Sequence, residues 1–249
     1  MSDLPSSRLN VQHGAPFENI SVDYFGPVML KYGRRARIKG YGIIFVCLTT
    51  KSVHVDLTTS LTSDAFLLAL RRLISEYGQP KMIISDNGSN FIGAERELKE
   101  MIRRWRDRAS EDYRNIQEFI SENQIRWIFN TPLAPHHNGL VESMVKSVKS
   151  ARKKLTHDRV MTEEEYRTFL VEVKNLINSR PLWPPNDGDL KDPAITCNDL
   201  LRPGNLNHHP VQLNHGSPRS RYEYVQRLVD EWWKIWLRNF VPSLLERNK

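Results

Sequence analysis

The sequence is poor in cysteine and lacks any long apolar run. Its 249 residues include only two cysteines, Cys47 and Cys197, which lie far apart and form no Cys-x-x-Cys pair. A disulfide scaffold and a cysteine-based zinc site are therefore not expected, and a reducing compartment fits best. No stretch approaches the roughly 20 apolar residues of a membrane span, and Met1-Ser2-Asp3 begins no signal peptide. The sequence thus predicts neither a membrane span nor secretion.

Acidic residues are also in deficit. The chain has 36 Lys and Arg against 29 Asp and Glu, a formal net charge of +7. This excess favours a polyanionic partner, nucleic acid first and an anionic membrane second. The length suffices for one sizeable core, because single cores stop growing at about 250 to 300 residues.

The first third of the chain has the pattern of a sheet. Residues 18–30 alternate between apolar and polar side chains, as a half-buried strand does. A basic, glycine-bounded turn at 31–40 separates them from two further strand-like segments, 41–50 and 53–60. Strands so close together predict an antiparallel meander of three.

Helical periodicity follows the meander. We expect Thr62 to cap a helix over 63–78, and residues 81–85 to form the next strand. A strand, a helix and a strand in this order predict a parallel crossover that covers one face of the sheet. The apolar stripe of this helix is predicted to contain Ala65, Leu68, Leu73 and Ile74.

The rest of the chain is predicted to be mostly helical. Residues 94–122 have a helical and highly charged pattern, and we expect a short strand at 124–130 to precede a long helix at 140–155. A Pro-, Asp- and Gly-rich stretch around Pro181 predicts a linker or surface loop. The final helix is expected at 219–240.

Three acids occupy positions where chemistry is expected. Asp86 directly follows a buried strand, Asp23 lies within the first strand on the face of Phe25, and Glu142 opens the long helix. Isolated carboxylates are costly to bury. Three of them converging near strand ends make sense if divalent cations neutralise them, and Mg²⁺ prefers carboxylate and water oxygens.

Each acid alone has a simpler explanation. The run Asp86-Asn87-Gly88 is also the pattern of an ordinary turn. Glu142 alone is a first-turn acid favoured by the helix dipole, and Asp23 alone could be a paired acid on a sheet edge. The combination of the three acids favours a shared metal site, and so does the long helix that follows Glu142.

The long helix carries two distinct faces. Lysines follow Glu142 at positions +4, +7 and +11, which lie on one helical face. These are Lys146, Lys149 and Lys153. Apolar residues that can pack on the sheet occupy another face: Val141, Met144, Val148 and Leu155. A carboxylate followed by a row of lysines is what a metal site beside a phosphate backbone needs.

The order of Asp23, DNGSNF at 86–91 and HHNGLVES at 136–143 closely resembles the catalytic core of retroviral and retrotransposon integrases. These enzymes belong to the RNase H-like superfamily of polynucleotidyl transferases. Finer detail resembles the BEL/Pao group of long-terminal-repeat retrotransposons: VDYFGP at 22–27, NSRPL at 178–182 and a tryptophan-rich segment from Tyr224.

The resemblance implies a reaction and a site. Asp23, Asp86 and Glu142 would be the catalytic acids and would bind two Mg²⁺ ions, for which Mn²⁺ can substitute. Water or a DNA 3′-hydroxyl would then attack a phosphodiester, giving DNA 3′-end nicking and strand transfer without a covalent protein intermediate. The residues expected to contact DNA are Asn87, Ser89, Asn90, Asn138, Lys146, Lys149 and Lys153.

The resemblance also implies an architecture and partners. The expected fold is α/β and RNase H-like, with a mixed five-stranded sheet (an antiparallel three-strand meander plus parallel strands) flanked by helices. We divide the chain into an N-terminal extension (1–15), an integrase catalytic core (16–160) and a helical C-terminal extension (161–249) with a Pro-rich loop (181–217). Expected partners are element ends, target DNA and further copies of the chain, with no membrane. The nucleus is the expected place of action on chromosomal DNA, and the cytoplasm otherwise.

Two departures from the family pattern stand out. Asp86 and Glu142 are separated by 55 residues, more than in retroviral integrases, and the charged helical insert around 96–122 accounts for the excess. The resemblance implies a His/Cys zinc-binding domain before the core and a DNA-binding domain after it, and neither is recognised in full between Met1 and Lys249, so we expect a polyprotein fragment or a truncated copy. The competing functions are an RNase H-like nuclease or cut-and-paste transposase with the same acids, and a non-catalytic DNA-binding relic.

Other features have structural explanations first. Cys47 is expected in the core, and His54 is expected to be a partnered structural histidine. The run RRARIK at 34–39 is predicted to be a solvated hairpin tip, with a DNA-facing role as the alternative. Three tryptophans of the final helix are expected to pack in the core, with an interface as the alternative: Trp232, Trp233 and Trp236.

Overall fold

The structure, a computed structural model, describes residues 15–85, 93–94, 96, 125–129, 148, 160–183, 195–202 and 220–245. Its strands are β1 (Asn19–Tyr32), β2 (Ala36–Cys47), β3 (Val53–Thr58), β4 (Met82–Ser85), β5 (Arg126–Phe129), β6 (Pro181–Trp183) and β7 (Ile195–Thr196). Its helices are α2 (Ser63–Tyr77), α6 (Glu163–Asn178), α7 (Cys197–Leu201) and α8 (Arg221–Leu245). No helix among the described residues is long and apolar enough to cross a membrane.

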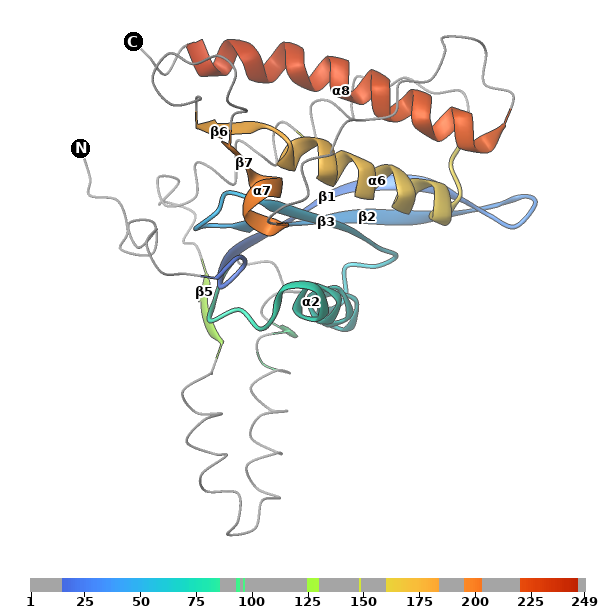
Figure 1. Ribbon diagram of the computed structural model, residues 1–249. Helices are drawn as coiled ribbons and strands as arrows, with labels where there is room; N and C mark the ends of the chain where they lie inside the picture. Colours follow the sequence, from blue (N-terminus) through green and yellow to red (C-terminus); the bar gives the residue numbers. More distant parts are fainter. Residues whose placement is uncertain are drawn as a thin grey trace.

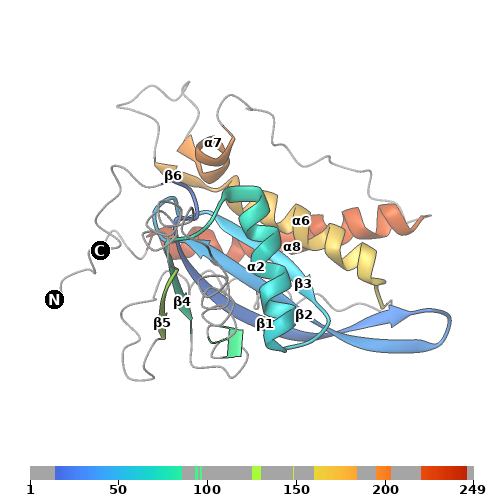
Figure 2. The same cartoon turned by 90° about the horizontal axis from the view of Figure 1, so that it is seen from below.

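A mixed five-stranded sheet organises the chain. Its strand order is β3-β2-β1-β4-β5, with β2 antiparallel to both β1 and β3, and with β4 and β5 parallel to β1. Helix α2 covers one face, and α6 with α8 stacked upon it covers the other (Figures 1 and 2). The predicted α/β fold, a meander followed by parallel strands, is confirmed. β1 is the central strand, so Asp23 does not belong to an edge strand, although the described pairing of β1 with β4 ends at Ser21, two residues before it.

Each face of the sheet has its own apolar core, as strand alternation requires. The core under α2 includes Ile20, Val22, Ile43, Phe45, Cys47, Phe66, Leu70 and Ile83. The core under α6 and α8 includes Phe25, Leu30, Ile44, Val55, Ile84, Val148, Phe169 and Trp232. The predicted core position of Cys47 is confirmed, and so is the packing of Trp232 and Trp236.

A bulge in β1 changes which side chains face which core. The pairing register of β1 with β2 shifts between Phe25 and Val28, around a cis peptide bond before Pro27. The ring of Phe25 covers Gly42 so closely that a Cβ there would lie 2.0 Å from it. Residue 42 must therefore be glycine. Beyond the bulge, even-numbered residues such as Leu30 face α6 and α8.

Helix α2 begins and ends as predicted. The Thr62 side chain accepts a hydrogen bond from the backbone N–H of Ala65 at 3.3 Å, and Gly78 follows the last turn with a φ of +89°. The predicted apolar stripe is wrong at Leu68, which is 59% exposed. The row that packs on the sheet starts one residue later than predicted and comprises Phe66, Ala69, Leu70 and Leu73.

Helix α6 lies within the extension (161–249) that was expected to be helical, but its bounds were not predicted. Thr162 and Glu165 form a capping box, in which each side chain bonds the other residue's backbone N–H. The Glu165 carboxylate also binds Arg221, at the start of α8. Burial acts to raise the pKa of Glu165, but these hydrogen bonds hold it below its ordinary value. One carboxylate therefore stabilises the start of α6 and links it to α8.

The end of α6 is bonded to the edge strand β3. The buried Asn178 amide donates to the carbonyl of Val53 and accepts from its backbone N–H, both at 2.8 Å. The buried Arg180 guanidinium donates to the carbonyls of Lys51 and Ile177. The first residues of the NSRPL motif thus satisfy backbone groups at an edge where no further strand of this sheet pairs.

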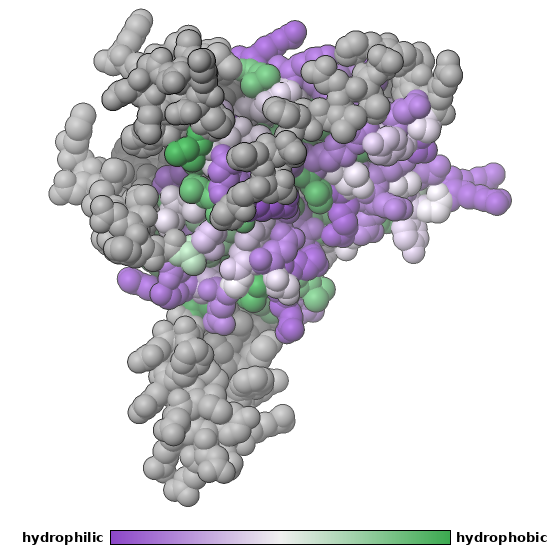
Figure 3. Space-filling view, in the orientation of Figure 1, coloured by the Kyte–Doolittle hydropathy of each residue, from purple (hydrophilic) through white to green (hydrophobic). Residues whose placement is uncertain are grey.

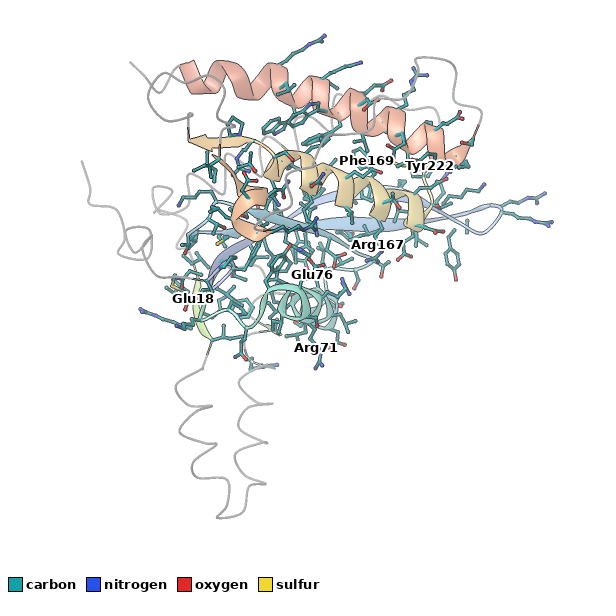
Figure 4. All side chains as sticks on the ribbon, in the orientation of Figure 1. Glu18, Arg71, Glu76, Arg167, Phe169 and Tyr222 are labelled. Carbon is teal, nitrogen blue, oxygen red and sulfur yellow. The ribbon has the colours of Figure 1, made fainter. Side chains whose placement is uncertain are left out.

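Two carboxylates link the helices on opposite faces of the sheet. Asp56 on β3 binds Arg72 of α2 and, at 3.0 Å, Arg167 of α6. Glu76 of α2 lies 3.4 Å from both His54 Nδ1 and the ammonium group of Lys174, which belongs to α6. Figure 4 shows Glu76 and Arg167 on the facing sides of the two helices. His54 is a structural histidine, as predicted.

The pKa of Glu76 predicts a pH dependence of stability. The contact with His54 is the largest cause that lowers the pKa of Glu76. Partial burial raises this pKa and the nearby Lys174 lowers it further, and the result is a pKa of about 2 instead of the ordinary 4.5. A lowered folded-state pKa stabilises above the ordinary value, and this contribution is lost as the pH falls towards 2. Urea denaturation of Glu76→Gln should therefore show a smaller loss of stability between pH 5 and pH 2 than wild type.

The expected difference is below about 1 kcal/mol, because Glu76 is nearly half exposed and screened by solvent. Glu164→Gln is the matched control, since Glu164 is an exposed carboxylate on α6. Parallel pH profiles for wild type and Glu76→Gln would show that the contacts of Glu76 contribute nothing to folding.

Candidate active site

Asp23 lies on the central strand, next to the bulge. It pairs with Ile44 of β2, and its Oδ1 accepts a hydrogen bond from the backbone N–H of Tyr24 at 2.7 Å. By alternation its side chain shares the α6 and α8 face of the sheet with Phe25, as predicted from the sequence. Its half-buried carboxylate therefore borders an apolar core instead of lying inside it.

The end of β4 lies beside Asp23. Strands β1 and β4 pair in parallel up to Ser21 and Ile84, so Ser85, one residue further, is level with Val22. Ser85 is fully buried, and its hydroxyl accepts a hydrogen bond from the indole N–H of Trp127 on β5 at 2.9 Å. The last residue of β4 is thereby fixed within the sheet, immediately before Asp86 in the chain.

The segment that follows β4 has a second fixed end. Gly93 is helical and lies so close to the start of α2 that a Cβ on it would be 2.1 Å from the hydroxyl of Ser63. Seven residues, 86–92, connect this glycine to Ser85. Four of the predicted site residues belong to this connection, whose two ends are therefore held by β5 and α2.

Val148 is the described residue nearest in sequence to Glu142. It is helical, 2% exposed and part of the core under α6 and α8. The prediction that Val148 belongs to the packing face of its helix is confirmed. It lies on the same side of the sheet as Asp23, and six residues can span at most about 20 Å.

Of the predicted site residues, the structure describes Asp23. The others lie outside the described residues: Asp86, Asn87, Ser89, Asn90, Asn138, Glu142, Lys146, Lys149 and Lys153. Among the residues that are described, no three His, Cys, Asp or Glu side chains form a group that could hold a metal ion. A metal site that includes Asp23 would therefore need ligands from outside the described residues.

Sequence reasoning missed the groups that support this site. The hydrogen bond between Trp127 and Ser85 and the close approach of Gly93 to Ser63 fix both ends of the segment that contains Asp86. A tryptophan on one strand and a serine on the next give no periodic signal. Gly93 alone was a usable signal, because a glycine at a helix start can mark close packing.

Comparison with known proteins gives distant similarities. No family model matches the chain. Over 234 residues it is 22% identical to a protein of Caenorhabditis elegans described as "Uncharacterized protein K02A2.6", which covers 86% of this chain and 16% of that protein. The chain therefore spans less than one fifth of that relative.

Two solved structures are similar to the chain. One belongs to the intasome of simian T-cell lymphotropic virus in complex with PP2A regulatory subunit B56 gamma, with 18% identity, a TM-score of 0.47, and coverage of 83% of this chain and 61% of that chain. The other is the HTLV-2 integrase catalytic core domain in complex with magnesium, in a trimeric form, with 20% identity, a TM-score of 0.41, and coverage of 69% and 91%.

Proposed function

We propose that the chain is the catalytic core of a retroelement integrase that cuts and joins DNA strands. The observation that supports this most strongly is the register of the central strands. Asp23 lies two residues beyond Ser21, and Asp86 lies two residues beyond Ile84, the residue with which Ser21 pairs. A continued parallel register would make the two acids neighbours at the carboxyl ends of adjacent strands, where open α/β sheets place their ligand sites.

The donor set fits magnesium. Asp23, Asp86 and Glu142 are all carboxylates, the hard oxygen ligands that Mg²⁺ prefers. When bound, two such ions would supply Lewis-acid stabilisation of the attacking and leaving oxygens of a phosphodiester. We infer that Asp23, Asp86 and Glu142 would together hold these ions.

The chain's own groups would set the geometry. The pairing of Asp23 with Ile44 of β2 would hold the first acid, while the hydrogen bond from Trp127 to Ser85 would keep the end of β4 in position. Lys146 and Lys149, which flank Val148 in the sequence, would hold DNA phosphates. Such positioning matters because a misplacement of about 1 Å can cost two orders of magnitude in rate.

The direct test is a nicking and joining assay. The purified chain is offered Mg²⁺ or Mn²⁺ with a duplex that carries a retroelement-like end and, separately, with a branched DNA that reports the reversal of strand transfer. We expect nicking and resealing that require the metal and stop in EDTA. Cleavage without any joining would favour the nuclease alternative. A folded chain that binds DNA but does neither reaction would be a non-catalytic relic.

A further inference from the structure

Strands β1 and β2 form a ribbon that projects beyond the rest of the sheet. Pairing of β1 with β4 ends at Ser21, whereas its pairing with β2 continues to Tyr32 and Ala36. The ribbon (residues 28–40) therefore extends past the end of β4, in the direction of the candidate active site's strand ends (Figures 1 and 2). Neither β4 nor β5 pairs with the ribbon.

One face of this ribbon packs against the rest of the protein and the other face is exposed. Leu30 and its partner Ile38 pack against the core under α6 and α8, and the backbone N–H of Lys31 donates to the carbonyl of Met161 at 2.8 Å, just before α6. By alternation, the neighbouring pairs point away from that core. The ribbon is thus held in place while its outer face stays accessible.

The open face and the tip are strongly basic. Five exposed cations lie there: Lys31, Arg34, Arg35, Arg37 and Lys39. The sequence contains no acid between Asp23 and Asp56, and no described carboxylate forms an ion pair with any of the five. Figure 3 shows hydrophilic side chains at the projecting end of the ribbon.

The placement of these charges does not favour the ribbon's own stability. Lys31 lies directly opposite Arg37, and like charges directly opposite each other on paired strands destabilise the pairing. Protection of a sheet edge from aggregation would need fewer charges than this. A polyanion would remove the repulsion, so the arrangement favours a ligand that carries regularly spaced negative charges.

The length of the ribbon matches duplex DNA. Gly33 at the tip lies ten positions beyond Asp23, which corresponds to about 30 Å of strand. B-DNA carries one phosphate charge per about 1.7 Å of its axis, so a duplex of that length presents roughly 18 phosphates. A duplex cleaved at Asp23 could therefore reach the arginines of the tip.

We propose that the β1–β2 ribbon binds the phosphate backbone of duplex DNA beside the active site, and that Arg34, Arg35 and Arg37 contribute most of this contact. The choice of DNA rests on the proposed function, but binding by the ribbon needs no metal and no catalysis. Phosphate contacts carry no sequence information directly, so the ribbon would position the duplex without selecting its sequence.

The test compares two triple variants of equal charge. In the ribbon variant, Arg34, Arg35 and Arg37 become alanine; in the control variant, three exposed cations of α2 and α8, Arg71, Lys234 and Arg238, become alanine. Binding of a fluorescent 30-base-pair duplex is measured by anisotropy in EDTA between 50 and 300 mM NaCl. We expect the ribbon variant to bind about tenfold or more weakly, with a log–log salt slope shallower by about 2 to 3.

Further arms keep the result interpretable. A charge-conserving triple variant should retain the wild-type salt slope of DNA binding; it carries Arg34→Lys, Arg35→Lys and Arg37→Lys. Circular dichroism should show the same fold for all variants. Binding of wild type and the ribbon variant to anionic vesicles is measured in the same way. Equal duplex affinities and salt slopes for the ribbon and control variants would overturn the proposal. It would also be overturned if the ribbon variant lost binding to the vesicles but kept binding to the duplex. Because all binding is measured without metal, a chain that fails the nicking assay can still confirm or refute the ribbon.

Discussion

Asp23→Asn is expected to abolish metal-dependent nicking and joining while leaving the fold intact. Removing a residue that merely orients a metal ligand costs about 10- to 100-fold, so losing a ligand should cost at least about a hundredfold. The fold should survive because the Asn side-chain oxygen can still accept the 2.7 Å hydrogen bond from the Tyr24 backbone. The measurement is the initial rate of nicking in Mg²⁺, with urea denaturation for stability.

Asp64→Asn provides the matched control, since Asp64 is an exposed acid in the first turn of α2, outside the proposed site. It should keep the wild-type rate. Asp86→Asn and Glu142→Gln should lose activity as Asp23→Asn does. Substantial Mg²⁺-dependent activity in Asp23→Asn would remove this residue from the catalytic site and leave its position beside β4 as a structural feature.

The sheet could be predicted from the sequence because its signals are local. Residues 18–30 and 53–60 alternate with period two, and Thr62 and Gly78 mark the ends of α2. The same alternation correctly placed Asp23 on the face of Phe25. The error at Leu68 arose because several apolar residues follow one another in α2, so that two helical rows fit almost equally well.

The parts of the fold that were not predicted include one helix with a local signal and several long-range contacts without one. Residues 163–178 carry a capping box and a clear apolar row, so α6 had a signal that was overlooked. The ion pairs of Asp56 and Glu76 have no such signal, because their partners come from helices about 100 residues apart in sequence. Motif resemblance identified NSRPL, and the structure supplies its physical role at the edge of the sheet.

Asn178→Ala is expected to lower the free energy of unfolding by about 2 to 4 kcal/mol. The change removes both partners of the Val53 backbone, and each buried group left without a partner costs about 1 to 3 kcal/mol. Water cannot readily replace the amide, because Val53 is fully buried and Asn178 is 2% exposed. Urea denaturation at neutral pH measures the loss.

Thr168→Ala serves as the control on the same helix. Its exposed hydroxyl bonds only the carbonyl of Glu164, so its loss should change stability by less than about 0.5 kcal/mol. Since β3 is separated from Asp23's strand by β2, Asn178→Ala should keep the wild-type nicking rate at temperatures where it stays folded. If Asn178→Ala were as stable as Thr168→Ala, the backbone groups of Val53 would have to find other hydrogen-bond partners without Asn178. A lower nicking rate in fully folded Asn178→Ala would instead mean that the edge of the sheet helps to position Asp23 through β2.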